Sequence, residues 1–206
     1  RKALSVQENQ FKALGVETGD SLNIMTKGMG FTAKRSGELR SELFATARAL
    51  GPHMKEAVFK EFVPAMNMLA AHGREKGVKI FKELMIQARI TGLSVGRMMS
   101  IVGQFDTFDG AAQAAGRLNA ILGGDYYNSI ELLRANEKDR ISLMKQGFAL
   151  SGKRFSNLRR YEKLALMNAA GLQSINEAFQ VFGTEQEKFD VLRKKAKAAG
   201  MTVEDY

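Results

Sequence analysis

The chain has 206 residues, of which 45% are hydrophobic and 26% charged, and it contains no cysteine. These proportions are typical of a folded globular chain and exclude an intrinsically disordered one. The absence of cysteine excludes disulfides, thiolate catalysis and zinc sites built on sulfur. The formal net charge of +9 favours an acidic partner, such as nucleic acid or an anionic surface, although a charge spread along the chain also serves solubility alone.

The two ends of the sequence indicate a segment of a longer protein. It opens with Arg1-Lys2-Ala3, without an initiator methionine or a secretory signal, and it closes on what reads as the start of another helix, Thr202 to Asp205. Its apolar stretches without a charge, such as residues 63–73, are too short to cross a bilayer, which takes roughly 20 residues. We therefore expect no membrane span in this segment.

Apolar residues recur every three or four positions along the chain, the spacing of amphipathic helices, and no strand-type alternation is sustained. The expected fold is all-α: an array of short to medium helices joined by Gly-centred turns, packed as an irregular helical bundle. Ser36 is expected to cap a helix that ends at Gly51-Pro52, and Pro64 to kink or restart the next one. In chain order, the expected apolar stripes are Leu39, Leu43, Phe44, Ala47 and Leu50; Val58, Phe59, Phe62, Met66 and Leu69; Phe81, Leu84, Met85 and Ala88; Phe108, Ala111, Ala112, Ala115, Leu118 and Leu122; Ile141, Met144 and Phe148; Leu158, Tyr161, Leu164 and Ala165; and Phe189, Leu192 and Ala196.

Helix ends are marked by a recurring pair, a glycine followed by an apolar residue. Glycine supplies the positive φ that ends a helix, and the apolar residue packs back onto the finished helix. The pair occurs at Gly15-Val16, Gly92-Leu93, Gly171-Leu172 and Gly200-Met201.

Two helix starts carry capping boxes, in which a Ser or Thr and a Glu three residues later satisfy each other's free backbone donors. They are Ser174 to Glu177 and Thr184 to Glu187. Gly183, between them, is expected to end the first of these helices in the left-handed conformation.

Motifs with catalytic or metal-binding chemistry find little support. Residues 92–96 match the G-x-S-x-G pattern of serine hydrolases, but that motif needs a preceding strand, whereas a helical pattern comes before it and Ser94 is expected to be an N-cap. Gly28-Met29-Gly30 lacks the strand, third glycine and lysine of a phosphate loop. His53 and His72 lack the spacing of metal ligands. We expect no enzyme activity, no cofactor and no metal.

A helix-turn-helix corner is the more serious alternative. Ala88, Gly92 and Met98 have the small residue, turn glycine and apolar spacing of that motif. The following helix offers a DNA groove only Arg97, Ser100 and Gln104, fewer than sequence-specific readers present, so a plain helix corner is favoured. A nucleic-acid-binding helical module built on Gly92-Ser94 is kept as the alternative function.

Basic residues gather in clusters that are able to follow a phosphate backbone or an acidic channel, although a solvated helix face explains them equally well. They are Lys153, Arg154, Arg159, Arg160, Arg193, Lys194 and Lys195, with Lys197 nearby.

A family resemblance begins at Phe62. Its strongest part is the ordered run of residues 105–112, followed by 116–124 and 127–129, and it continues through 151–153, 161–165 and 169–172 to Phe182-Gly183. In this order the chain resembles the tape-measure proteins of tailed bacteriophages, over a little more than half its length. Before Phe62 it resembles them only in its helical style.

The resemblance implies a long, mostly helical protein that occupies the lumen of the tail tube, sets tail length and leaves ahead of the DNA at infection. It implies contacts with tail-tube and tail-tip or baseplate proteins, a homo-oligomer (trimer or hexamer) on the tail axis, and transient contact with DNA. The expected location is the virion, in the tail tube lumen or tip, after assembly in the host cytoplasm. The expected regions are 1–51, an N-terminal helical region that is a fragment of a longer chain; 52–183, the helical module that resembles tape-measure proteins; and 184–206, the truncated start of a further helical region.

The run from Phe105 to Gly124 is the candidate contact patch, although its helical spacing favours ordinary core packing. Within it Asp106 and Asp109 lie close enough to suggest an acid–base pair, but each flanks a Phe near a helix start, where a carboxylate favours the helix dipole. The candidate patch residues are Phe105, Asp106, Phe108, Asp109, Leu118, Asn119 and Leu122.

Overall fold

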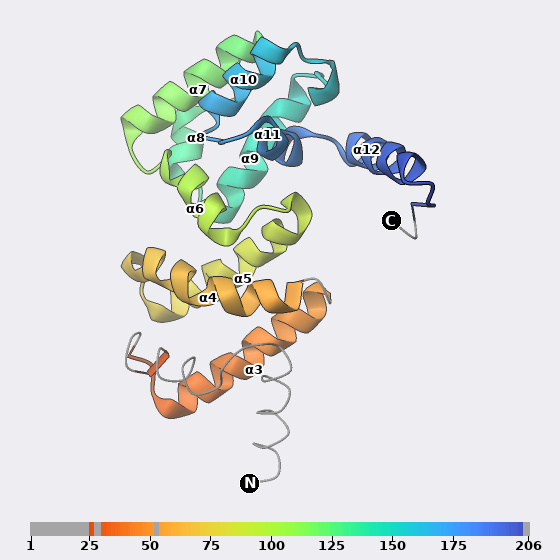
Figure 1. The fold of residues 1–206 in the computed structure, drawn as a ribbon. Coiled ribbons are helices and arrows are strands. Elements are labelled where there is room, and N and C mark those ends of the chain that lie inside the picture. Colours follow the sequence, from red (N-terminus) through yellow and green to blue (C-terminus); the bar gives the residue numbers. More distant parts are fainter. Residues whose placement is uncertain (1–24, 27–29, 52–53, 204–206) are drawn as a thin grey trace. The chain divides into compact units, whose positions relative to one another are not determined.

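The computed structural model describes residues 25–26, 30–51 and 54–203 (Figure 1). Within these ranges the regular structure is helical, with ten α-helices, two short 3₁₀ helices and no strand, so the all-α expectation is confirmed. Several expectations lie outside the described residues: those for Gly15-Val16, Gly28-Met29, Pro52, His53 and the end of the Thr202–Asp205 stretch.

The chain forms two compact units, residues 1–97 and 98–206. Their boundary falls inside α6 (Val95–Gly103). The three regions expected from the sequence were drawn by resemblance rather than by compactness, and they stay a prediction.

In the first unit, α3 (Ala33–Leu50), α4 (Lys55–Met68) and α5 (Arg74–Thr91) pack on one another, with the 3₁₀ helix η3 (Ala70–His72) between α4 and α5. The predicted apolar stripes meet in its core, where the rings of Phe62 and Phe81 make an edge contact with centroids 5.2 Å apart. Arg35 and Lys82 both donate to the carboxylate of Glu42, at 2.6 and 2.7 Å, and these contacts hold its pKa below the usual value.

One expectation for this unit is wrong. The N-cap of α3 is Thr32, whose hydroxyl accepts from the Arg35 backbone N–H; Ser36 lies inside the helix and is buried. At Pro64 a kink or a restart was expected: helix α4 continues through Pro64 to Met68, so the helix does not restart there, and the kink stays a prediction.

The second unit continues with α7 (Phe108–Leu122), α8 (Ser129–Arg134), α9 (Glu137–Leu150), the 3₁₀ helix η4 (Phe155–Asn157), α10 (Arg160–Ala169), α11 (Ile175–Phe182) and α12 (Glu185–Ala198). Helix α7 packs on α8 and α10, and α11 packs on α9 and α10 (Figure 1). The rings of Phe148, Phe155 and Phe182 form an aromatic cluster between α9, η4 and α11.

Gly92, Gly171 and Gly200 all have φ near +70°, as the glycine–apolar pairs predicted. Leu93 and Leu172 pack back and are buried, whereas Met201 is 46% exposed. Gly183 was predicted to be left-handed, but its φ is −65°. It is buried beside Phe179, whose carbonyl oxygen leaves no room there for a side chain.

Candidate interaction surface

Three of the four large apolar side chains of the candidate patch lie in the core. Phe105, Leu118 and Leu122 are buried, with exposed fractions of 3% or less. Phe108 is the exception: it begins α7 at a helix-period position but is 59% exposed. The patch therefore contributes packing, with one apolar side chain left at the surface.

Asp106 belongs to a clamp around a buried arginine that sequence reasoning missed. The guanidinium of Arg140 donates to the carbonyl oxygens of Leu132 (2.9 Å) and Leu133 (3.0 Å) at the end of α8. It also donates to the carbonyl of Val102 (3.1 Å) and to the carboxylate of Asp106. The clamp thus joins α6, the turn before α7, α8 and α9. Asp106 and Asp109 form no acid–base pair: Asp106 binds Arg140, and Asp109 lies exposed in the first turn of α7.

Asn119 closes the loop after α7. Its side-chain oxygen accepts from the backbone N–H groups of Tyr126 (2.9 Å) and Tyr127 (2.8 Å), and its amide nitrogen donates to the Tyr127 carbonyl (2.9 Å). Tyr127 is buried, donates its hydroxyl to the Met144 carbonyl at 2.8 Å, and places its ring against Gly147 of α9. Burial raises the pKa of the Tyr127 hydroxyl. Asn119 is therefore a structural residue.

A small hollow of about 110 Å³ lies beside this loop. A volume of this size holds a few water molecules rather than a cofactor. Its lining residues come from α8, α9 and the loop before α8, and include Tyr126, Glu131 and Gln146.

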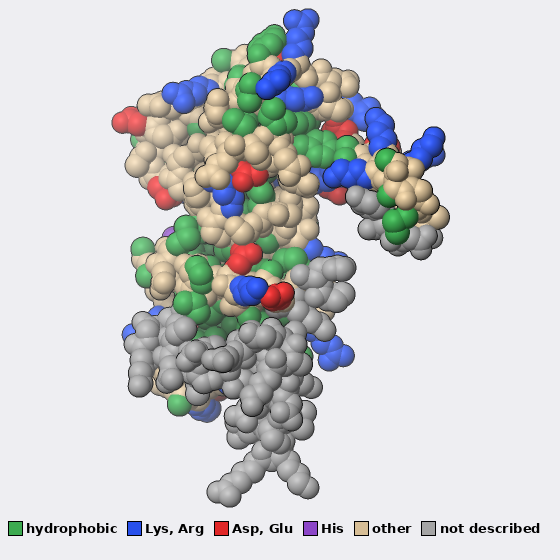
Figure 2. All heavy atoms as spheres, in the orientation of Figure 1, with side chains coloured by type: hydrophobic (Ala, Val, Ile, Leu, Met, Phe, Trp, Pro, Cys, Tyr) green, Lys and Arg blue, Asp and Glu red, His purple; other side chains and the backbone are tan. Residues whose placement is uncertain are grey.

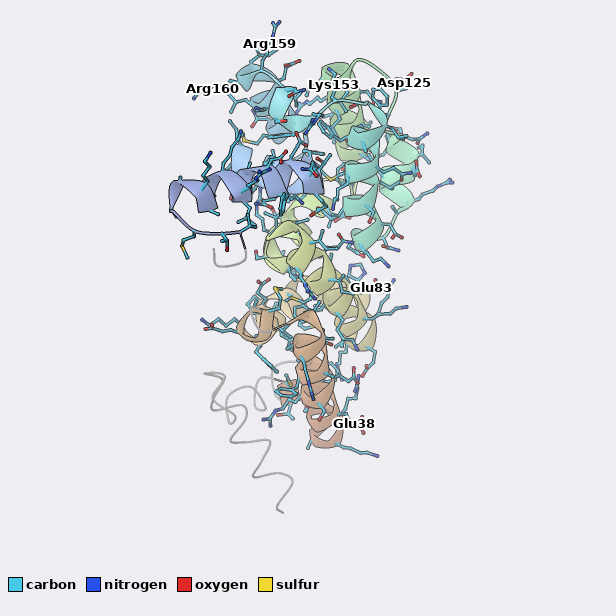
Figure 3. All side chains as sticks on the ribbon, turned by 90° about the vertical axis from the view of Figure 1, so that its right-hand side faces the viewer. Glu38, Glu83, Asp125, Lys153, Arg159 and Arg160 are labelled. Atoms are coloured by element: carbon cyan, nitrogen blue, oxygen red, sulfur yellow. The ribbon has the colours of Figure 1, made fainter. Side chains whose placement is uncertain are left out.

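The predicted basic residues fall into two groups. In the first, Lys153 is half-buried and donates to the Ile121 carbonyl at 3.2 Å, and Arg154 lies 3.9 Å from the carboxylate of Glu187. Arg159 and Arg160 are exposed at the start of α10, and in Figure 3 their side chains point away from the helices. In this group Lys153 is therefore structural, whereas Arg154, Arg159 and Arg160 reach solvent.

The second basic group, Arg193, Lys194 and Lys195, lies on α12. Of the fourteen residues of α12 only Glu187 and Ala196 are buried. Of the apolar stripe predicted for this helix, Phe189 is 49% and Leu192 37% exposed, and only Ala196 is buried. Figure 2 shows blue cations beside green apolar side chains along this helix.

Glu187 ties α12 to the segment before α10. Its carboxylate accepts from the backbone N–H of Thr184 (2.9 Å) and of Ser156 (2.8 Å), and from both hydroxyls. Burial alone would raise its pKa, but these hydrogen bonds favour the charged form and lower the pKa to about 2. The capping box predicted at Thr184 is confirmed, and the contact with Ser156, 31 residues away, is the part the sequence did not reveal.

The G-x-S-x-G segment is a helix corner. Helix α5 precedes Gly92, and the Ser94 hydroxyl accepts from the Arg97 backbone N–H at 3.1 Å as an N-cap. The hydrolase interpretation fails, because that motif needs a strand in place of α5. A second cap of α6 comes from Glu61 of α4, whose carboxylate accepts from the Val95 backbone N–H. Burial raises the pKa of the Glu61 carboxyl.

Among the described residues, His72 and the carboxylates make no cluster of three or more potential metal ligands. None of the helices described is both long enough and apolar enough to span a bilayer. In comparisons with known proteins, no family, no curated protein and no solved structure matches the chain.

Proposed function

We propose that the chain is a structural segment of a phage tape-measure protein, which sets tail length inside the tail tube and is released ahead of the DNA. The observation that carries this proposal is the ordered run of residues 105–129, which resembles that family. An all-helical chain with glycine-ended helices is compatible with it.

The positions of this run in the structure add support. Asp106 binds the buried Arg140, Thr107 caps α7, Asn119 closes the next loop and Asn128 caps α8. Its polar residues thus cap helices and close loops in one part of the fold, a structural role that is compatible with the proposal.

The test measures tail length in the phage that encodes the chain. An in-frame deletion of the segment should give shorter tails in electron micrographs, because the tape sets the length. If the segment were one continuous helix along the tail axis, its deletion would shorten the tail by about 1.5 Å per residue. Because the segment is folded, we expect its deletion to shorten the tail by less. Tails of unchanged length would contradict the proposal.

Light scattering of the isolated segment is the companion measurement, since the axial location predicts a trimer or hexamer.

The alternative function is nucleic-acid binding through the α5–α6 corner. The corner geometry exists: Gly92 is left-handed and Ser94 caps α6. However, α6 has nine residues, and Val95, Met98, Ile101 and Val102 are buried. Binding of a short duplex that weakens steeply with added salt, and that is lost in Arg97→Glu, would favour this alternative over the tape-measure proposal.

A further inference from the structure

Helix α12 presents an apolar stripe bordered by cations. With 3.6 residues per turn, Phe189, Leu192 and Ala196 lie along one side of the helix. Arg193 and Lys197 lie along one edge of this stripe. On the other edge lie Lys188 and Lys195, and the opposite face carries Lys194.

Two of the three positions of the stripe, Phe189 and Leu192, are open to a partner, whereas Ala196 is buried. Phe189 and Leu192 are exposed by 49% and 37% and border an open hollow of about 490 Å³. Its other lining residues are Glu185, Gln186 and Lys188. The surface thus offers an aromatic and an aliphatic anchor at the i, i+3 spacing by which helices dock into grooves.

The cations bordering the stripe differ in their exposure and in whether a carboxylate pairs with them. Lys188 is paired with Glu185 at 3.0 Å, and its side chain is only 15% exposed. Arg193, Lys195 and Lys197 are exposed, and in the described part of the chain no carboxylate forms an ion pair with them. Residues 191–199 contain no acidic side chain. The charge along both edges is therefore available to a partner that carries carboxylates.

We propose that α12 is a docking helix for an acidic amphipathic helix of another protein, with Phe189 and Leu192 as anchors and Arg193, Lys195 and Lys197 as partners for its carboxylates. This surface goes beyond the tape-measure proposal and does not depend on it.

Two other anionic partners fit less well. Duplex DNA would pair with the cations but leave Phe189 and Leu192 in water. An anionic membrane would take up the apolar stripe, but the carboxylate of Glu185, 79% exposed, lies in line with that stripe and would have to enter the lipid boundary. A protein helix can instead place a hydrogen-bond donor against Glu185.

The test uses the whole chain and a fluorescein-labelled synthetic helix with Leu at its a and d positions and Glu at e and g. We expect saturable binding by fluorescence anisotropy. Phe189→Ser should weaken it by about tenfold, as for an aromatic anchor. Arg193→Glu should weaken it several-fold, whereas Lys194→Glu, the same charge change on the opposite face of the same helix, should stay within about twofold.

A peptide with Gln in place of Glu should bind much more weakly. The proposal would be overturned by no binding of the acidic peptide, or by equal loss in Arg193→Glu and Lys194→Glu. Phe189-dependent binding of duplex DNA or of phosphatidylserine vesicles that is tighter than peptide binding would also overturn it. So would Phe189-dependent self-association in light scattering, which would assign the face to a second copy. Circular dichroism of each variant checks that the fold is kept.

Discussion

At the scale of single residues, polar side chains hold together segments that are far apart in the sequence. Arg140 contacts three carbonyl oxygens as well as Asp106, 34 residues away. The Asp106 side chain is 65% exposed and that of Arg140 only 7%. The exposed carboxylate is therefore screened by water, and the carbonyl contacts carry most of the stabilisation.

Because the carbonyl contacts of Arg140 outweigh its ion pair with Asp106, we expect variants at these two residues to differ in stability. Arg140→Lys keeps the charge but cannot reach all three carbonyls, and should lower the free energy of unfolding by about 2–3 kcal/mol. Asp106→Ala should lower it by less than about 1 kcal/mol. Urea unfolding followed by circular dichroism measures both. A larger effect of Asp106→Ala than of Arg140→Lys would show that the ion pair dominates.

Glu187 predicts a dependence of stability on pH. Its pKa in the folded chain, about 2, lies below the ordinary value of 4.5. Its contribution is therefore fully present above about pH 4.5 and is lost as the pH falls toward 2, with a maximum of about 3 kcal/mol. Glu187→Gln removes the titration, so its stability should fall less steeply between pH 5 and pH 3 than that of the unchanged chain. Parallel curves for the two chains would rule out this role for Glu187.

At the scale of elements, two helical glycines have opposite surroundings. A Cβ at Gly147 of α9 would lie 2.4 Å from the Tyr127 ring, whereas a Cβ at Gly116 of α7 meets nothing within 4 Å. Gly147→Ala should destabilise the chain by about 1–3 kcal/mol through overpacking. Gly116→Ala should stabilise it by about 0.5–1 kcal/mol, because alanine favours the helix. Thermal melts of the two variants should therefore shift in opposite directions.

Helix positions followed from the sequence because apolar spacing and caps are local. The stripes of α3, α4 and α5 and the caps at Ser94 and Thr184 were all predictable from residues at most a few positions apart. Spacing shows which residues share a face, but not whether another element covers it. Phe108, Tyr161, Leu164, Phe189 and Leu192 were therefore placed correctly on helices, but their spacing could not show that their side chains are exposed.

The candidate site was harder to predict than the fold. The clamp of Arg140 and the contact of Glu187 with Ser156 join segments more than thirty residues apart, and no local pattern encodes such pairs. The local signal for the clamp is the position of Arg140, directly before Ile141, the first residue of the α9 stripe.

At the scale of the whole molecule, the chain has two compact units with separate aromatic contacts: Phe62 with Phe81 in the first, and Phe148 with Phe155 and Phe182 in the second. Residues 94–206 contain the second unit together with all of α6 and its Ser94 cap. This fragment should give a helical spectrum and a cooperative thermal transition, since its core is internal to it. A gradual, non-cooperative melt would show that the second unit needs the first.

The double role of Glu187 has a consequence for the opening motions of the chain. The same carboxylate closes the first turn of α12 and accepts the Ser156 backbone N–H, so neither contact can be released while the carboxylate keeps its position. The backbone amides of Thr184 and Ser156, although far apart in sequence, should therefore show the same free energy of opening in hydrogen exchange, set by a single opening event.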